Sequence, residues 1–332
     1  MARHLIPQLP RVDPVALAGT AGPIKQRAAM LSIASNTLLI LLKVAAGAIT
    51  GSVAILTEAM HSSVDLIASI VAYYSIRKAD VPADEDHPYG HAKIENLAAT
   101  IEGMLILVGS GIIVFEATRR LIVGSHVQKI GFGIAVIGLS IVVNLIVSTI
   151  LARRARAFDS PALEADAAHL RTDAATSVGV LIGLVLVAVT DITWLDPAIA
   201  LLVAAAIVVA GVRIITRSSR VLVDEALPEE ELGAIRETVA GFGPRGVAGF
   251  HALRARRAGA RRYVDLHVQF RDGTTLEGAH RTAHALQDAI RARVRNADVL
   301  IHLEPEDRVK PGTEVDPVDP APSRCGRRPT AG

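Results

Sequence analysis

The sequence predicts a membrane α-helical protein with six transmembrane helices, followed by a small cytoplasmic α+β domain. Its 332 residues are 51% hydrophobic with a mean hydropathy of +0.39, which is too apolar for an ordinary soluble protein. An apolar run of about 20 residues can span a bilayer. The chain has six such runs, at 28–50, 52–76, 94–123, 130–152, 174–190 (extended back through His169) and 197–215.

The segments outside these runs set the expected domain limits. We expect a disordered cytoplasmic tail over 1–24, a transport domain over 25–223, a cytoplasmic metal-binding domain over 224–306 and a disordered tail over 307–332. The first of these has prolines and no continuous apolar core, which argues against a cleavable signal peptide. The single Cys325 excludes an intramolecular disulfide and a thiolate cluster for Cu(I).

The distribution of Lys and Arg predicts the orientation in the membrane, because these residues mark cytoplasmic loops. One set of connections is rich in them, whereas two of the three alternate loops have none. The basic set comprises Lys25, Arg27, Arg77, Lys78, Lys93, Arg153, Arg154, Arg156, Arg213, Arg217 and Arg220. We therefore expect both termini in the cytoplasm of a multi-pass protein of the cell membrane.

Two pairs of ionisable residues recur inside the apolar runs. His61 and Asp65 are four residues apart, as are His169 and Asp173, so each pair lies on one face of its helix. An Asp within the hydrocarbon costs a few kcal/mol and by default marks a functional site. Either pair alone could be a polar contact in helix packing. Together, two imidazoles and two carboxylates form a four-ligand site that suits Zn²⁺.

Other polar residues of the first two spans receive weaker interpretations. We expect Asn36 and Lys43 to face protein or reach the interface, and we assign them no chemistry. Glu58 lies one turn before His61, where it could orient that imidazole. The interpretation we favour for Glu58 is exposure to water near the external end of its helix.

A loop after the second span predicts another cluster. Pro88 and Gly90 indicate a turn-rich segment, in which Asp84, His87 and His91 are close enough in sequence to share one ion. The alternative is a solvated acidic loop before a helix.

The residues after Pro228 change to the pattern of a small soluble domain. Helical spacing of apolar residues predicts helices over 229–242 and 276–294. Alternation of apolar and polar residues predicts strands over 247–256, 261–270 and 298–302. The order α-β-β-α-β indicates a two-layer α+β domain.

The hairpin of this domain predicts a facing pair of histidines. If the hairpin is centred on Gly259, His251 lies directly opposite His267, with Cβ atoms about 5 Å apart. Two imidazoles at that separation can share one metal ion or each bind one of two adjacent ions. His302 and Glu304 on the third strand could add two further ligands.

With these residues in place, the chain resembles the cation diffusion facilitators, a family of zinc and related divalent-metal proton antiporters, from about Lys25 to Glu306. The motifs are Gly51-Ser52-Val53-Ala54-Ile55-Leu56 with His61 and Asp65, the loop motif, His169 with Asp173, Asp224-Glu225-Ala226-Leu227-Pro228, and the histidines of the last domain.

The resemblance implies a role for each matched residue. His61, Asp65, His169 and Asp173 match the transport site, and Asp84, His87 and His91 match a loop site. A binuclear cytoplasmic-domain site is matched by His251, His267, His280, His302 and Glu304. Lys93 and Asp224 match a charge interlock between the membrane halves of a homodimer. The implied fold is six transmembrane helices with a metallochaperone-like domain.

Three positions depart from the family's best-studied bacterial members. His61 stands where they have Asp, and this form resembles the zinc-preferring branch. Glu304 replaces a family Asp and can still ligate. Leu303 replaces a Gln and cannot ligate, which puts one ion of the binuclear site in doubt.

We therefore expect a zinc efflux transporter in the lipid bilayer that uses protons as the counter-ion, with Zn²⁺ as its transported and regulatory ion. An Fe²⁺, Mn²⁺, Co²⁺ or Cd²⁺ transporter of the same mechanism is an alternative. A membrane-anchored metal sensor is another, but it does not explain histidine and aspartate pairs inside the bilayer. A hydrolase lacks a recognisable general base and a substrate cleft, and nothing in the sequence indicates a nucleic-acid partner.

Overall fold

The structure is a computed structural model, and it describes residues 14–50, 53–123, 131–190, 192, 194–308 and 313–318. It divides into two compact units, Met1–Leu222 and Val223–Gly332. Each unit is considered by itself.

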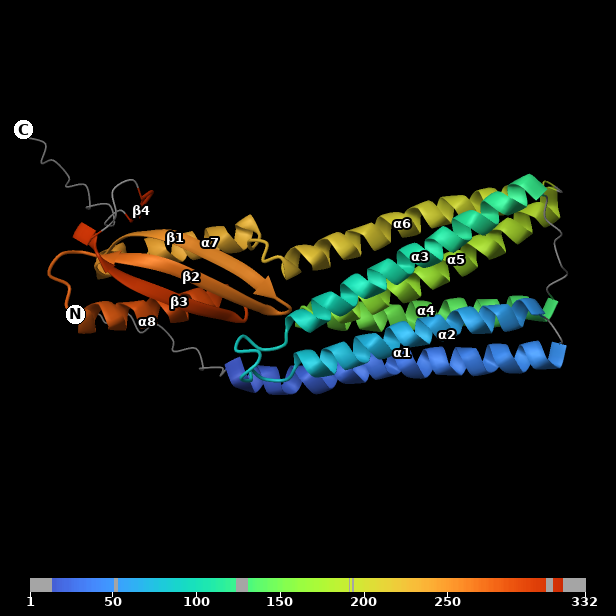
Figure 1. The fold of residues 1–332 in the computed structure, drawn as a ribbon, viewed down its shortest axis with the longest axis horizontal. Coiled ribbons are helices and arrows are strands. Elements are labelled where there is room, and N and C mark those ends of the chain that lie inside the picture. Colours follow the sequence, from blue (N-terminus) through green and yellow to red (C-terminus); the bar gives the residue numbers. More distant parts are fainter. Residues whose placement is uncertain are drawn as a thin grey trace, which may run out of the picture. The chain divides into compact units, whose positions relative to one another are not determined.

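The first unit consists of six long helices (Figure 1), as the apolar runs predict. They are α1 (Pro14–Thr50), α2 (Val53–Ala79), α3 (Lys93–Val123), α4 (Gly131–Phe158), α5 (Pro161–Thr190) and α6 (Leu195–Leu222). α1 begins at Pro14, so the expectation of a disordered tail over 1–24 is wrong for residues 14–24. Pro23 lies inside this helix.

Among the described residues, four of the six helices have segments long and apolar enough to cross a membrane. These segments are Gly22–Ile49, Lys93–Ile122, Ile137–Phe158 and Pro197–Leu222. α2 and α5 are 27 and 30 residues long.

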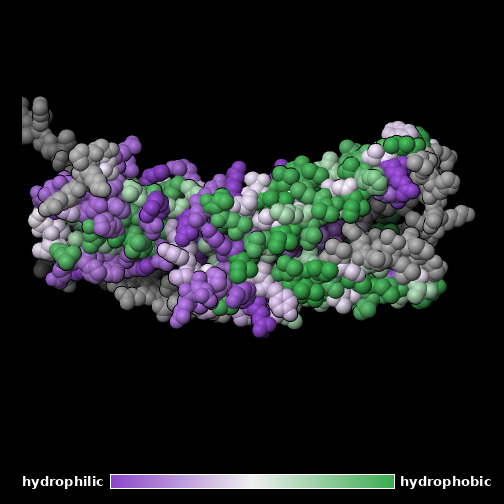
Figure 2. All heavy atoms as spheres, in the orientation of Figure 1, coloured by the Kyte–Doolittle hydropathy of each residue, from purple (hydrophilic) through white to green (hydrophobic). Residues whose placement is uncertain are grey.

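Helix contacts arrange α1, α2, α4 and α5 around a shared core, with α3 and α6 packed against each other beside it. The core is built from small and branched apolar side chains such as Ala29, Ile76, Leu151, Leu163 and Leu170. Large apolar side chains face outward, among them Phe115 at 70% and Leu202 at 73% exposure. Figure 2 shows the hydrophobic surface that such side chains form over the long helices. An apolar exterior of this kind suits a lipid environment.

One end of the helix bundle is closed by a buried ionic cluster. Lys25 on α1 lies 2.7 Å from Asp80 Oδ1 and 2.8 Å from Glu95 Oε1 on α3. Ser160, which precedes α5, donates a hydrogen bond to the other oxygen of Glu95. Lys25 is therefore more than a marker of orientation, because it joins α1 and α3 at the end where α4 meets α5.

The second unit is a two-layer α+β domain. Its elements are α7 (Glu229–Ala240), β1 (Val247–Ala258), β2 (Arg261–Phe270), α8 (Leu276–Arg293), β3 (Ala297–Pro305) and β4 (Asp316–Pro317). The strand order is β3-β2-β1-β4, in which β2 and β3 are parallel and the other neighbours antiparallel. Side chains of α7, α8 and one sheet face form the core, including Ile235, Leu266, Leu286 and Ile290.

The predicted α-β-β-α-β order holds, but the sheet has a fourth strand. β4 pairs with β1 through Asp316 and Pro317, and Val318 beside it is buried in the core at 3% exposure. The expectation of disorder over 307–332 is therefore wrong for these residues. The apolar side chain of Val318 is the local signal that a Pro-rich composition obscures.

The hairpin of β1 and β2 places His251 directly opposite His267, as predicted. The route to this register differs from the prediction. Next to the turn, Arg261 pairs with Ala258, so the hairpin is centred between Gly259 and Ala260. An extra residue in β1 between His251 and Arg254 then shifts the register by one. Ala252, within this bulge, has a left-handed φ of 51°.

Candidate metal centres

The bundle brings together three of the four predicted transport-site residues. Asp65 on α2 and His169 and Asp173 on α5 offer ligand atoms that all lie within 4.8 Å of one another. His169 Nε2 is 3.1 Å from Asp65 Oδ1, to which it donates, and 3.8 Å from Asp173 Oδ2. Asp65 and His169 are each 7% exposed. This is a buried nitrogen and oxygen donor set of the kind that divalent metals bind.

His61 lies in α2, one turn before Asp65. Its side chain is outside the described residues, so the prediction that it completes the site stays a prediction.

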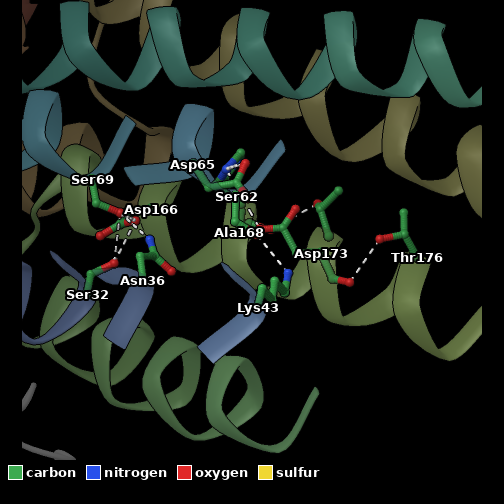
Figure 3. Close-up of polar contacts among 12 residues, drawn as sticks. Ser32, Asn36, Lys43, Ser62, Asp65, Ser69, Asp166, Ala168, Asp173 and Thr176 are labelled. Atoms are coloured by element: carbon green, nitrogen blue, oxygen red, sulfur yellow. Dashed lines mark hydrogen bonds and ion pairs between the residues drawn. The ribbon is translucent and has the colours of Figure 1, made fainter. Parts of the chain in front are cut away.

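A cavity of about 30 Å³ adjoins this donor set. Its lining includes Asp65, Asp173, Asn36, Lys43 and Asn144. Lys43 Nζ donates to Ser62 Oγ at 2.7 Å, and Figure 3 shows both beside Asp173. A space of this size can hold a water or a small ion.

The sequence interpretation assigned no chemistry to Asn36 and Lys43, and the structure places both at the site. Asn36, Lys43 and Asn144 are all buried. Their polarity within apolar runs was the available signal. The sequence alone does not predict what these side chains contact, because their contacts depend on how the helices pack.

The three predicted loop residues also lie together. Asp84 Oδ1 accepts from the backbone N–H of His87 at 2.7 Å and lies 3.1 Å from His87 Nδ1. His91 Nε2 is 3.3 Å from the other oxygen of Asp84. Desolvation raises the pKa of the Asp84 carboxyl, but the hydrogen bonds and charges of the two histidines outweigh it, so the pKa lies below its usual value.

His91 is the most informative member of this loop cluster. It is 3% exposed, and neither ring nitrogen makes a hydrogen bond within the described structure. Buried polar groups are nearly always satisfied. An imidazole in this state, with an aspartate and a second histidine nearby, is suited to bind a cation.

On the sheet of the second unit, three predicted ligands meet on the face opposite the core. Glu304 accepts from His251 Nε2 at 2.7 Å and from His267 Nδ1 at 2.8 Å. Burial raises the pKa of the Glu304 carboxyl. The hydrogen bonds and charges of the two histidines outweigh that effect, so the pKa lies below its usual value.

Of the two other predicted ligands in this domain, His302 lies beside the cluster and His280 does not. His302 pairs with His267 across the parallel strands and lies 3.5 Å from Glu304, with its side chain 63% exposed. His280 does not join the group: it lies on the exposed face of α8, with its Nε2 3.1 Å from that of His284. Because α8 packs on the other face of the sheet, the structure does not bring His280 to the ligand cluster of the same chain.

Lys93 and Asp224 each have partners within their own unit. Lys93 Nζ donates to the carbonyl oxygen of Leu222 at 3.2 Å. Asp224 accepts from Arg256 at 3.0 Å and has a left-handed φ of 60°. The charge interlock between them stays a prediction.

Comparisons with known proteins cover both units. Residues 29–223 match the family described as the cation efflux transmembrane domain, and residues 227–306 match the cation efflux protein cytoplasmic domain. An uncharacterized transporter of Synechocystis, sll1263, is 36% identical over 293 residues, or 88% of this chain and 94% of that protein.

The cation-efflux pump FieF of Citrobacter koseri is 32% identical over 292 residues, covering 86% of this chain and 94% of the pump. A solved structure of CzrB in its zinc form is 36% identical, covers 26% of this chain and 98% of that chain, and has a TM-score of 0.23. Together with its apolar helices, the match to the cation efflux family and the similarity to FieF make the chain a multi-pass membrane transporter and not an enzyme.

Proposed function

This chain belongs to the cation diffusion facilitator family of cation efflux transporters, and from that membership we propose that it exports Zn²⁺ in exchange for protons. The observation that carries the proposal is the buried group of Asp65, His169 and Asp173, with His61 as the expected fourth ligand. Two imidazoles and two carboxylates match the tetrahedral nitrogen and oxygen coordination that zinc prefers. The same donors also bind Fe²⁺, Mn²⁺, Co²⁺ and Cd²⁺, and geometry decides among these ions.

Proton exchange follows from the chemistry of the ligands. A histidine must be neutral and an aspartate ionised to bind a metal, so loading releases protons. When the site faces outward, protons compete for the imidazoles, whose ordinary pKa is near 6.5, and so discharge the metal. One pair on each of two helices suits alternating access, because movement of α2 against α5 would open and close the site.

The loop and sheet clusters are further metal sites in this proposal. Asp84, His87 and His91 would bind an ion at the end of α3. His251, His267 and Glu304, with His302 beside them, would bind a regulatory ion in the cytoplasmic domain. The match to that domain supports a homodimer. Lys93 and Asp224 are proposed to connect the membrane halves of that dimer, with both termini in the cytoplasm.

Metal flux in proteoliposomes tests the transport proposal. The protein is reconstituted into vesicles that contain a fluorescent zinc indicator. These vesicles should accumulate Zn²⁺ faster when their interior is more acidic than the outside, because protons then leave in exchange for the metal. The double variant Asp65→Ala/Asp173→Ala provides the transport-dead control. Zinc flux that is insensitive to the pH gradient would remove proton exchange from the proposal. An absence of flux for every divalent metal tested would favour a membrane-anchored sensor.

A further inference from the structure

Two carboxylates outside the predicted donor set are fully buried near His169. Glu102 on α3 and Asp166 on α5 are both 0% exposed. Asp166 precedes His169 by three residues, so it lies on the same helix face, roughly 4.5 Å further along the axis. Glu102 interacts electrostatically with both Asp166 and His169. These acids therefore belong to one electrostatic group with the transport site.

Glu102 lies next to a close contact between α3 and α6. A Cβ atom on Gly103 would lie 2.7 Å from the Ile215 side chain and 3.3 Å from the Gly211 carbonyl oxygen, so this position of α3 is pressed against α6. The adjacent residue of a helix is rotated by about 100°. Glu102 is therefore on a different face of α3, and its electrostatic interaction with Asp166 and His169 indicates that its carboxylate lies near α5.

The hydrogen bonds around the pair are incomplete. Asp166 Oδ1 accepts from Ser32 on α1 and from Ser69 on α2, each at 3.1 Å, and Figure 3 shows Asp166 between these hydroxyls. Asp166 Oδ2 has no hydrogen-bond partner within the described structure. The same is true of both carboxylate oxygens of Glu102 and of His169 Nδ1. Four buried polar atoms in one electrostatic group thus lack a partner.

The charges of this group do not balance if both acids are ionised. In the described part of the chain, the ionisable groups that act on Glu102 are Asp166 and His169, and α1 and α2 contribute only hydroxyls to Asp166. His169 already donates to Asp65, which is itself an acid. Two ionised carboxylates that are buried from solvent repel each other and lose their hydration. Burial and like charge therefore favour a proton on one of the two acids.

We propose that Glu102 and Asp166 form a proton-binding site that is occupied when the transport site is empty and releases its proton when a metal ion binds at His169. A dication one helical turn away favours the ionised form of both acids. By reciprocity, a proton on the pair weakens metal binding by the same factor. The pair would thus hold one of the exchanged counter-ions apart from the metal ligands. This inference rests on the proposed metal/proton exchange.

Proton release on zinc binding tests the inference in the detergent-solubilised full chain. A pH-indicator titration gives the number of protons released per protomer at zinc saturation, and zinc affinity is measured across a range of pH. Glu102→Gln keeps the size of the side chain but cannot ionise. We expect it to bind zinc and to release up to one proton fewer than the wild type. The pH dependence of its affinity should be shallower, by up to about tenfold per pH unit.

Glu116→Gln is the matched control, because Glu116 lies on the same helix and is exposed beside Arg119 and Arg120. It should release as many protons as the wild type. The loop and sheet sites are identical in all three proteins, so differences isolate Glu102. If Glu102→Gln does not purify as a monodisperse protein, Asp166→Asn takes its place with the same expected decrease.

Two outcomes have different meanings for the proposals. Unchanged proton release and unchanged pH dependence in the folded acid variants would overturn the inference about Glu102 and Asp166 and leave the exchange mechanism intact. If the wild type itself bound zinc without releasing protons, the proposed exchange would fail, and the inference would fail with it.

Discussion

Asp65 on α2 and His169 on α5 are 104 residues apart in the chain, yet Asp65 Oδ1 and His169 Nε2 lie 3.1 Å from each other. This contact joins α2 and α5 at the proposed transport site. Because the imidazole donates a hydrogen bond to the carboxylate, each group offsets part of the free-energy cost of burying the other. A metal ion that binds here must replace this hydrogen bond with two coordinate bonds.

Removing either aspartate should abolish transport. Asp65→Ala and Asp173→Ala each delete an anionic ligand whose charge offsets that of the ion. Mutating a residue that only hydrogen-bonds to a metal ligand lowers metal affinity roughly 10- to 100-fold. We expect the loss of a ligand itself to lower it more. Uptake of radioactive zinc into proteoliposomes measures the transport, with Glu116→Ala as the control. Retained uptake by Asp65→Ala would show that the ion is bound elsewhere.

The identity of residue 61 should set metal selectivity. A carboxylate binds through one or both oxygens at variable distance, whereas an imidazole offers one nitrogen per ion. His61→Asp should keep zinc transport, with weaker proton coupling near neutral pH, and should admit Cd²⁺ or Mn²⁺. Competition assays in vesicles measure this preference. If the wild type already carries Cd²⁺ as well as Zn²⁺ and the variant is no different, His61 does not determine selectivity.

The cytoplasmic domain should gain stability from zinc. A fragment of residues 223–318 retains β4 and the buried Val318. Zinc at 100 times its dissociation constant should stabilise this fragment by about 2.7 kcal/mol, and we expect it to dimerise. His251→Ala combined with His302→Ala should abolish the rise in melting temperature, whereas His284→Ala should not. A wild-type melting temperature that is indifferent to zinc would argue against a site here.

The stability of the metal-free domain should depend on the ionisation of Glu304. The pKa of Glu304 in the folded domain is lowered, and an unfolded Glu ionises near pH 4.3. Its ionised form therefore stabilises the fold above about pH 4.3, and this contribution is lost as the pH falls through the folded pKa. Glu304→Gln should be less stable than the wild type at neutral pH, with a difference that shrinks in acid. Thermal unfolding in the presence of a chelator, measured across this pH range, tests the prediction. A stability difference between the two proteins that does not change with pH would contradict it.

The orientation of the chain can be tested with its own single cysteine. The basic loops predict a cytoplasmic C-terminus, so Cys325 should resist a membrane-impermeant thiol reagent in intact cells. The same reagent should label it after permeabilisation. Labelling of intact cells would reverse the predicted orientation.

The sequence by itself determined the features that depend on local periodicity. Apolar runs predict the six helices, the four-residue spacing puts His169 and Asp173 on one face of α5, and alternation predicts β1 and β2. Each of these follows from the repeat of a single helix or strand. The facing of His251 and His267 was also predicted, although the bulge at Ala252 produces that register.

Only the tertiary structure decided which of these faces meet. It separates His280 from His251 and Glu304, because α8 covers one face of the sheet and the ligand cluster lies on the other. It also buries Glu102 of α3 where its charge acts on Asp166 of α5. No local pattern carries this information, since helix rotation and sheet coverage are settled by packing between segments distant in the chain.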